Sequence, residues 1–113
     1  MHIEQKKIEP DVNVLELTGK ITLGRESQKI EWTVDELLGK NEKKFIFDLS
    51  KIDYVDSSGL GIIVSCSGKV KKAGGSLRVV GAHDRVLQIF KMTGLDAVLI
   101  CCPTMAEAVA SSS

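Results

Sequence analysis

The chain has 113 residues, and its 15 basic and 15 acidic side chains give a formal net charge of +0 at pH 7. This length fits one domain, and a hydrophobic content of 43% provides a core without metals or disulfides. The balanced charge argues against nucleic acid or an anionic membrane surface as the main partner, because both select a basic excess.

The three cysteines, Cys66, Cys101 and Cys102, are odd in number and two of them are adjacent. We therefore expect reduced, largely buried thiols rather than a disulfide framework. The cysteine and histidine spacings suggest no metal site, and we expect no cofactor. Because no signal peptide and no apolar run of roughly 18 residues is found, the sequence predicts a cytoplasmic protein that does not act at a membrane.

Two strands are expected near the amino terminus, over residues 3–8 and 12–18, with a turn at Pro10 between them. Gly19 is expected to end the second strand. The nearly continuous apolar run over 45–49 is typical of a strand that is buried on both faces of a parallel sheet.

A helix is expected over about 25–40, where apolar residues recur on one face. Trp32 lies nearly opposite that face, and the sequence leaves two interpretations equally open. It is either an exposed interface anchor or a side chain packed under the terminal strand or a loop. A second helix is expected to begin after Asp56 and to stop at Gly74 and Gly75.

The last third of the chain continues the alternation of strands and helices. We expect a strand over 77–80, a helix around 86–90 closed by Gly94, a strand over 98–100 and a helix opened by Pro103. This order predicts one α/β domain over residues 1–110, with a mixed, mostly parallel sheet of about five strands flanked by about four helices. Residues 111–113 are expected to form a disordered tail.

The run from Asp56 to Gly61 lies where a buried strand gives way to a helix, the edge at which parallel sheets bind partners. Ser57 or Ser58 could cap the helix, and Gly59 would permit close packing on the sheet. Alternatively, a phosphate on Ser57 would add about −1.5 to −2 charges at pH 7, which the helix dipole tolerates but a docking surface would not. Local chemistry alone favours the cap.

Residues 48–50 (Asp-Leu-Ser) and 52–61 (Ile-Asp-Tyr-Val-Asp-Ser-Ser-Gly-Leu-Gly) resemble the signature of the STAS family, the anti-sigma factor antagonists. Residues 17–19 and 89–95 resemble weaker family motifs and lie in the expected order. The resemblance implies a mixed sheet flanked by helices. It also implies a protein that binds an anti-sigma factor, itself a serine kinase, and so frees a sigma factor.

Within this resemblance, Ser57 is the phosphate acceptor and Ser58 the neighbouring cap. Phosphorylation of Ser57 would break the complex, and a PP2C-type phosphatase would restore it. The resemblance places the partner-binding switch loop at Asp56, Ser57, Ser58, Gly59 and Leu60. Thr22 stands where the family's antagonists usually carry an aspartate near the acceptor, and this difference bears on phosphorylation more than on binding.

Other functions fit the sequence less well. The Gly-x-Ser-x-Gly elbow of a hydrolase is missing around Ser57, and His2 and His83 are expected to be surface histidines, so we expect no enzyme. Val64 interrupts a dinucleotide fingerprint. The alternative that keeps the fold is a non-phosphorylated STAS scaffold, or a subunit of a stressosome-type or lipid-trafficking complex. The sequence does not specify an oligomeric state.

Overall fold

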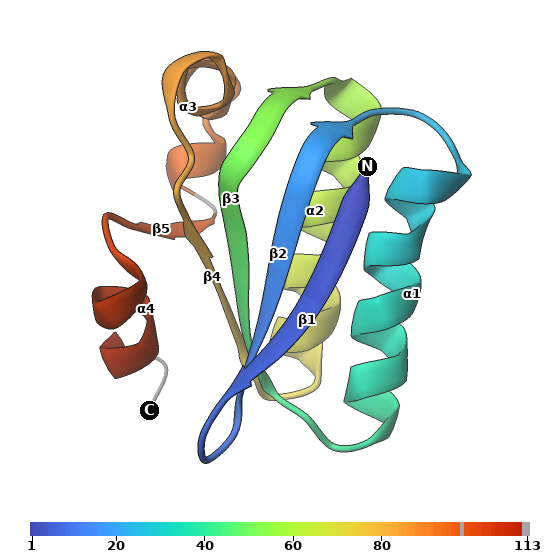
Figure 1. The fold of residues 1–113 in the computed structure, drawn as a ribbon, viewed down its shortest axis with the longest axis vertical. Helices are drawn as coiled ribbons and strands as arrows, with labels where there is room; N and C mark the ends of the chain where they lie inside the picture. The colour runs from blue at the N-terminus through green and yellow to red at the C-terminus, as the bar shows by residue number, and fades with distance from the viewer. Residues whose placement is uncertain (98, 112–113) are drawn as a thin grey trace.

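Five strands lie side by side in chain order in the computed structural model, which describes residues 1–97 and 99–111 (Figure 1). The strands are β1 (His2–Ile8), β2 (Val12–Ile21), β3 (Lys44–Val55), β4 (Ser76–Val80) and β5 (Ile100–Cys102). β1 pairs with β2 in the antiparallel sense, and every later neighbour pair is parallel. The expected mixed, mostly parallel sheet is confirmed.

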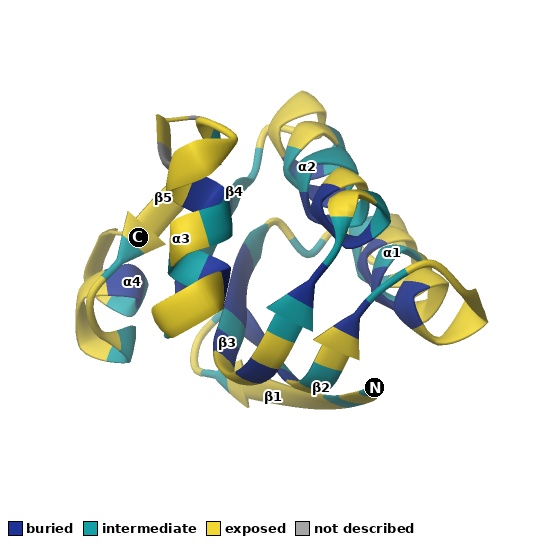
Figure 2. Ribbon diagram, turned by 90° about the horizontal axis from the view of Figure 1, so that it is seen from above, coloured by how far each residue is buried: buried dark blue, intermediate teal, exposed yellow. Residues whose placement is uncertain are grey.

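Four α-helices flank this sheet, as expected. They are α1 (Arg25–Gly39), α2 (Ser57–Lys72), α3 (Asp84–Met92) and α4 (Met105–Ser111), and a short 3-10 helix spans Leu95–Ala97. α1 and α2 lie together on one face of the sheet, whereas α4 covers the other, and α3 lies beyond the end of β4 (Figures 1 and 2). No helix among the described residues is long and apolar enough to cross a membrane.

β3 is the centre of the core. Phe45 and Phe47 pack with Ile30 and Val34 of α1, whereas Ile46 joins Val14 and Ala108 on the α4 face. The apolar side chains therefore alternate between two buried faces, which explains the nearly continuous apolar run.

β2 and β3 are both longer than the sequence predicts. Gly19 does not end β2; it adopts a φ of 105° at a register irregularity, and the strand continues to Ile21. β3 likewise continues past residue 49 to Val55, where it pairs with Ile21. Pairing between strands extends both elements, and local propensity does not report this contribution.

The carboxyl-terminal elements differ from the expectation in detail. The last strand was expected over 98–100 but begins at Ile100, because the 3-10 helix occupies the preceding segment; residue 98 lies outside the described residues. Ser111 is the last residue of α4 rather than part of a tail, and residues 112–113 also lie outside the described residues.

The three cysteines are not uniformly buried, which corrects the expectation of largely buried thiols. Cys66 is buried in α2, and burial raises the pKa of its thiol to about 12. Cys101 is exposed, because it lies in the short strand β5 at the edge of the sheet, where one side has no neighbouring strand.

α2 approaches the end of β2 very closely at Gly59. A Cβ atom at this position would lie 2.1 Å from the backbone oxygen of Ile21, a distance that no side chain can occupy. The glycine therefore fixes the distance between the start of α2 and the sheet. At Gly61, two residues further along the same helix, a Cβ atom would meet nothing within 4 Å.

His83 connects the start of α3 to the sheet. Its Nε2 lies 2.9 Å from the Ser50 carbonyl oxygen and its Nδ1 lies 2.8 Å from Oδ2 of Asp84. The pKa of His83 is raised above its usual value, mainly by the bond to Asp84 and then by the bond to Ser50 and the nearby charge of Asp53. Burial lowers this pKa by a smaller amount. Both neighbours are acceptors, so the protonated ring satisfies both.

We predict that Gly59→Ala lowers the free energy of unfolding by about 1–3 kcal/mol, because the added methyl group pushes α2 away from β2. The matched control is Gly61→Ala in the same helix, where the exposed site should gain about 0.5–1 kcal/mol. Urea unfolding followed by circular dichroism measures both. Equal effects of the two substitutions would contradict the close approach at Gly59.

We also predict a pH-dependent contribution of His83 to stability. Because its pKa is raised in the folded state, the contribution is complete below the unfolded pKa of about 6.5 and is lost as pH rises through the folded pKa. His83→Gln should therefore lower the melting temperature most near pH 5.5, and the difference should shrink toward pH 8. His2→Gln in β1 is the control; a His83 difference independent of pH would contradict the assignment.

Candidate functional site

The candidate site lies where β2 and β3 end and α2 begins. The backbone N–H of Asp56 donates to the Ile21 carbonyl oxygen at 3.2 Å. The backbone N–H of Leu23, in the loop between β2 and α1, donates to Oδ2 of Asp56 at 3.2 Å. These two bonds join the loop after β2 to the start of α2, so segments more than 30 residues apart form one surface.

Asp56, and neither serine, caps α2. Its Oδ1 accepts the backbone N–H of Gly59 at 2.8 Å, and its backbone is extended at the cap position. The expectation that Ser57 or Ser58 forms the cap is therefore wrong: both are already helical residues. A carboxylate at the cap satisfies an N–H group and complements the helix dipole, so the serine hydroxyls are not needed for this task.

The residues of the expected switch loop differ in exposure. Ser57 is exposed, Ser58 and Asp56 are partly buried, and Gly59 and Leu60 are buried. Neither serine hydroxyl has a hydrogen-bond partner among the described residues. Leu60 packs in the core, so it anchors the loop.

Thr22 lies in the loop beside this cap. Its backbone N–H donates to the Oγ atom of Ser27 at 3.0 Å, and Ser27 is buried in the first turn of α1. The structure therefore holds Thr22, the residue before Leu23, through its backbone. Sequence reasoning missed Ser27 and also Leu23, which is exposed between Thr22 and Gly24; a large apolar residue between turn residues was the available signal.

A phosphate group on Ser57 would meet two opposing fields. In the first intrahelical bond of α2, the N–H of Leu60 donates to the Asp56 carbonyl oxygen at 2.9 Å. The N–H groups of Ser57 and Ser58 come before this bond, so they carry the positive end of the helix dipole. The Asp56 carboxylate adjoins them with the opposite sign. The positive end of the helix would therefore stabilise a phosphate on Ser57, while the phosphate would strongly change the charge of the surrounding protein surface.

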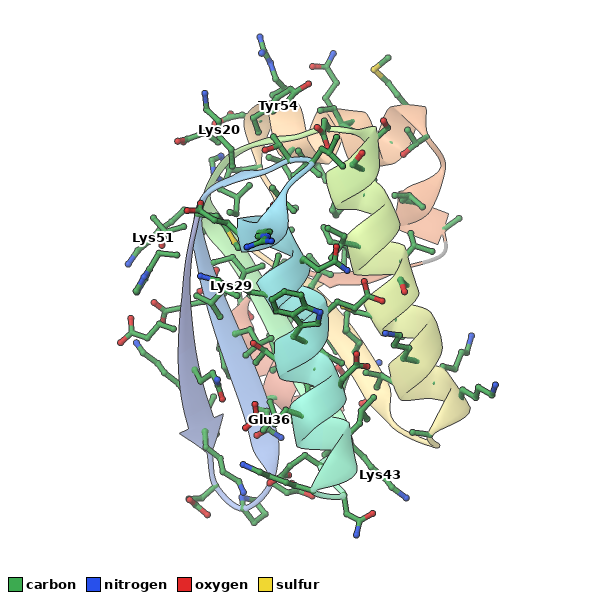
Figure 3. The ribbon with its side chains drawn as sticks, turned by 90° about the vertical axis from the view of Figure 1, so that its right-hand side faces the viewer. Lys20, Lys29, Glu36, Lys43, Lys51 and Tyr54 are labelled. Carbon is green, nitrogen blue, oxygen red and sulfur yellow. The ribbon has the colours of Figure 1, made fainter. Side chains whose placement is uncertain are left out.

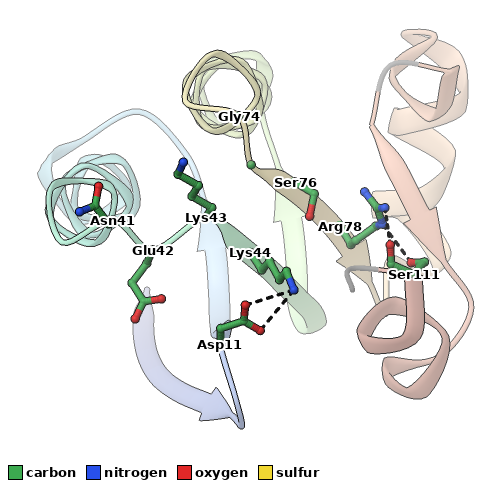
Figure 4. Close-up of a pocket in the computed structure, with 10 residues that line it drawn as sticks. Asp11, Asn41, Glu42, Lys43, Lys44, Gly74, Ser76, Arg78 and Ser111 are labelled. Atoms are coloured by element: carbon green, nitrogen blue, oxygen red, sulfur yellow. Dashed lines mark hydrogen bonds and ion pairs between the residues drawn. The ribbon is translucent and has the colours of Figure 1, made fainter.

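Other features of the chain do not extend this site. His83 does not bond to Ser57, since its ring nitrogens face Ser50 and Asp84. No group of three or more potential metal ligands occurs within the described residues. A cavity of about 500 Å³ lies at the opposite end of the sheet, where Lys44 pairs with Asp11 at 3.1 Å and Arg78 bonds to Ser111 (Figure 4).

Known sequences resemble the chain over most of its length. A Thermotoga maritima protein named a candidate anti-sigma factor antagonist is 28% identical over 103 residues, which cover 91% of each chain. A Thermotoga neapolitana homologue of that protein is 30% identical over the same share of both chains. The anti-sigma-B factor antagonist of Bacillus subtilis is 39% identical over 51 residues, 45% of this chain and 47% of that protein.

Solved structures agree with these sequences. The crystal structure of a Thermotoga maritima protein, also named a candidate anti-sigma factor antagonist, superposes with a TM-score of 0.88 at 25% identity, covering 97% of this chain and 93% of the other. The antagonist SpoIIAA in its phosphorylated form superposes with a TM-score of 0.75, covering 99% of this chain and 100% of the other; its 15% identity supports the fold alone. The STAS domain family matches residues 5–108. The chain therefore belongs to the STAS domain family, among relatives named anti-sigma factor antagonists.

Proposed function

We propose that the chain is an anti-sigma factor antagonist whose docking surface is centred on Ser57 and is switched off by phosphorylation of that residue. Its partner is an anti-sigma factor serine kinase, which releases a sigma factor when the antagonist binds. A PP2C-type phosphatase restores the active form. The relatives' names support the antagonist role, and the family resemblance supplies the kinase and the phosphatase.

The observation that carries this proposal is the exposed, unbonded hydroxyl of Ser57 at the start of a firmly held helix. Asp56 caps α2 in its place, so phosphorylation removes no bond that holds the fold. A kinase can reach the hydroxyl, and the phosphate would change the charge of the surface without unfolding it. A structural relative, SpoIIAA, has been solved in both unphosphorylated and phosphorylated forms.

The energy required of the switch is modest. A loss of about 100-fold in affinity corresponds to about 2.7 kcal/mol, which the desolvation of a phosphate against a surface shaped for a neutral serine can supply. The adjacent Asp56 carboxylate adds like-charge repulsion for any acidic group that approaches. The switch thus needs no conformational change in the antagonist.

One observation favours a second function. Thr22 stands beside the cap where the family's antagonists usually carry an aspartate, so the acceptor lacks one neighbouring carboxylate. A STAS scaffold, or a subunit of a stressosome-type or lipid-trafficking complex, would bind through the same surface without phosphorylation. The two functions differ in their response to charge at Ser57.

We predict that Ser57→Ala keeps the affinity for the anti-sigma factor within about twofold, whereas Ser57→Asp weakens it by about 100-fold. Isothermal titration calorimetry with the purified kinase measures both. Ser58→Asp is the matched control, since the same charge is placed one residue away at a partly buried position. Equal affinity of Ser57→Ala and Ser57→Asp would instead support a scaffold function.

A second prediction concerns the modified residue. Incubation with the kinase and ATP should add one phosphate, and peptide mass spectrometry should place it on Ser57. Thr22→Asp restores the carboxylate that the family usually has, and we expect it to change the rate of phosphorylation more than the affinity. Phosphate found on Ser58 alone would rule out Ser57 as the acceptor.

A further inference from the structure

Two large apolar side chains are exposed on the loop after β2 and on α1. Leu23 is 81% exposed in the loop between β2 and α1, and Trp32 is 54% exposed on α1. More than half of the indole is therefore exposed, so neither the terminal strand nor a loop covers it fully. Leu23 and Trp32 line the same hollow, with a volume of about 770 Å³, and we call this hollow the α1 groove.

The α1 groove carries an excess of positive charge. Arg25 and Lys29 both line it, and neither has a carboxylate within ion-pair distance among the described side chains. Glu26 also lines the groove, but it pairs with the terminal ammonium group of Met1 at 2.8 Å. Lys29 lies on the side of α1 that faces the terminal strand β1, where it also lines a hollow with residues of that strand (Figure 3). The groove thus combines two apolar side chains with two cations, of which Lys29 also acts through its charge on the Glu26 carboxylate.

The groove is continuous with the candidate site. Leu23 forms one of its walls through its side chain, and the backbone N–H of the same residue bonds to the Asp56 carboxylate. A protein that covers Ser57 therefore meets Leu23 first and Trp32 next along α1. Tryptophan and arginine are enriched among the residues that dominate binding energy at interfaces.

We propose that the α1 groove binds an acidic segment of the anti-sigma factor, with an apolar side chain of that segment between Leu23 and Trp32 and its carboxylates against Arg25 and Lys29. This inference rests on the proposed function and adds a second contact region to it. Charge complementarity selects the occupant, because an acidic segment matches the two cations, neither of which forms an ion pair within the described residues. A second copy of the chain fits poorly, since a twofold contact through this groove would place like charges face to face.

Binding measurements with the purified anti-sigma factor kinase test the proposal. Trp32→Ala should weaken binding roughly 10- to 100-fold, because it removes an apolar anchor. Lys29→Glu should weaken binding at least about tenfold, because it reverses a charge that would pair with a carboxylate of the kinase. Leu23→Ser should act in the same direction. Two matched controls lie outside the groove. Lys43→Glu reverses an exposed charge just past the other end of α1. Ile100→Ser removes an exposed apolar side chain from β5. Both should stay within about twofold of the wild type.

A spectroscopic readout does not depend on any substitution that could disturb folding. Trp32 is the chain's single tryptophan, so 5-fluorotryptophan labelling gives one ¹⁹F resonance from the groove. This resonance should shift when the kinase binds. A photo-crosslinker placed at Gln28, which also lines the groove, should capture a peptide of the kinase rich in aspartate or glutamate.

The outcomes separate this inference from the proposed function. If Ser57→Asp abolishes binding while Trp32→Ala and Lys29→Glu bind like the wild type and the ¹⁹F resonance is unmoved, the groove proposal is overturned and the antagonist function stands. If crosslinks map to a neutral or basic segment, the acidic occupant is wrong. If the wild-type chain does not bind the kinase at all, both proposals are overturned.

Discussion

The Asp56 carboxylate is the constraint on which the candidate site depends. One of its oxygens caps α2 through the N–H of Gly59, and the other accepts the N–H of Leu23 from the loop after β2. A single side chain thus holds the start of a helix and a distant loop in one arrangement. Each bond to an ionised acceptor is stronger than one between neutral groups, so the geometry is held firmly.

This arrangement separates the work of holding the fold from the work of presenting a site. Because the aspartate caps the helix, the hydroxyl of Ser57 is free of structural duties and faces solvent. Gly59 allows α2 to lie against the Ile21 carbonyl group, and Leu60 anchors the first turn in the core. A charge can therefore be added at Ser57 at little expense to the packing beneath it.

The same loop connects the candidate site to the apolar and basic surface on α1. Leu23 has its backbone at the cap and its side chain in the groove, so one residue contacts both regions. A partner that reads the charge state of Ser57 would also contact Trp32 and Lys29. Two separate contact regions would give specificity, because a competitor must match the switch loop and the groove together.

The sequence by itself determined the class of the fold, the buried strand around Phe47 and the run from Asp56 to Gly61, because hydrophobic periodicity and turn residues report local structure directly. It could not determine that β2 continues past Gly19, since pairing with β3 decides this. It could not decide which residue caps α2 or whether Trp32 is exposed. Those answers depend on groups far apart in the chain, such as Leu23 and Asp56, that only the tertiary structure brings within hydrogen-bond distance.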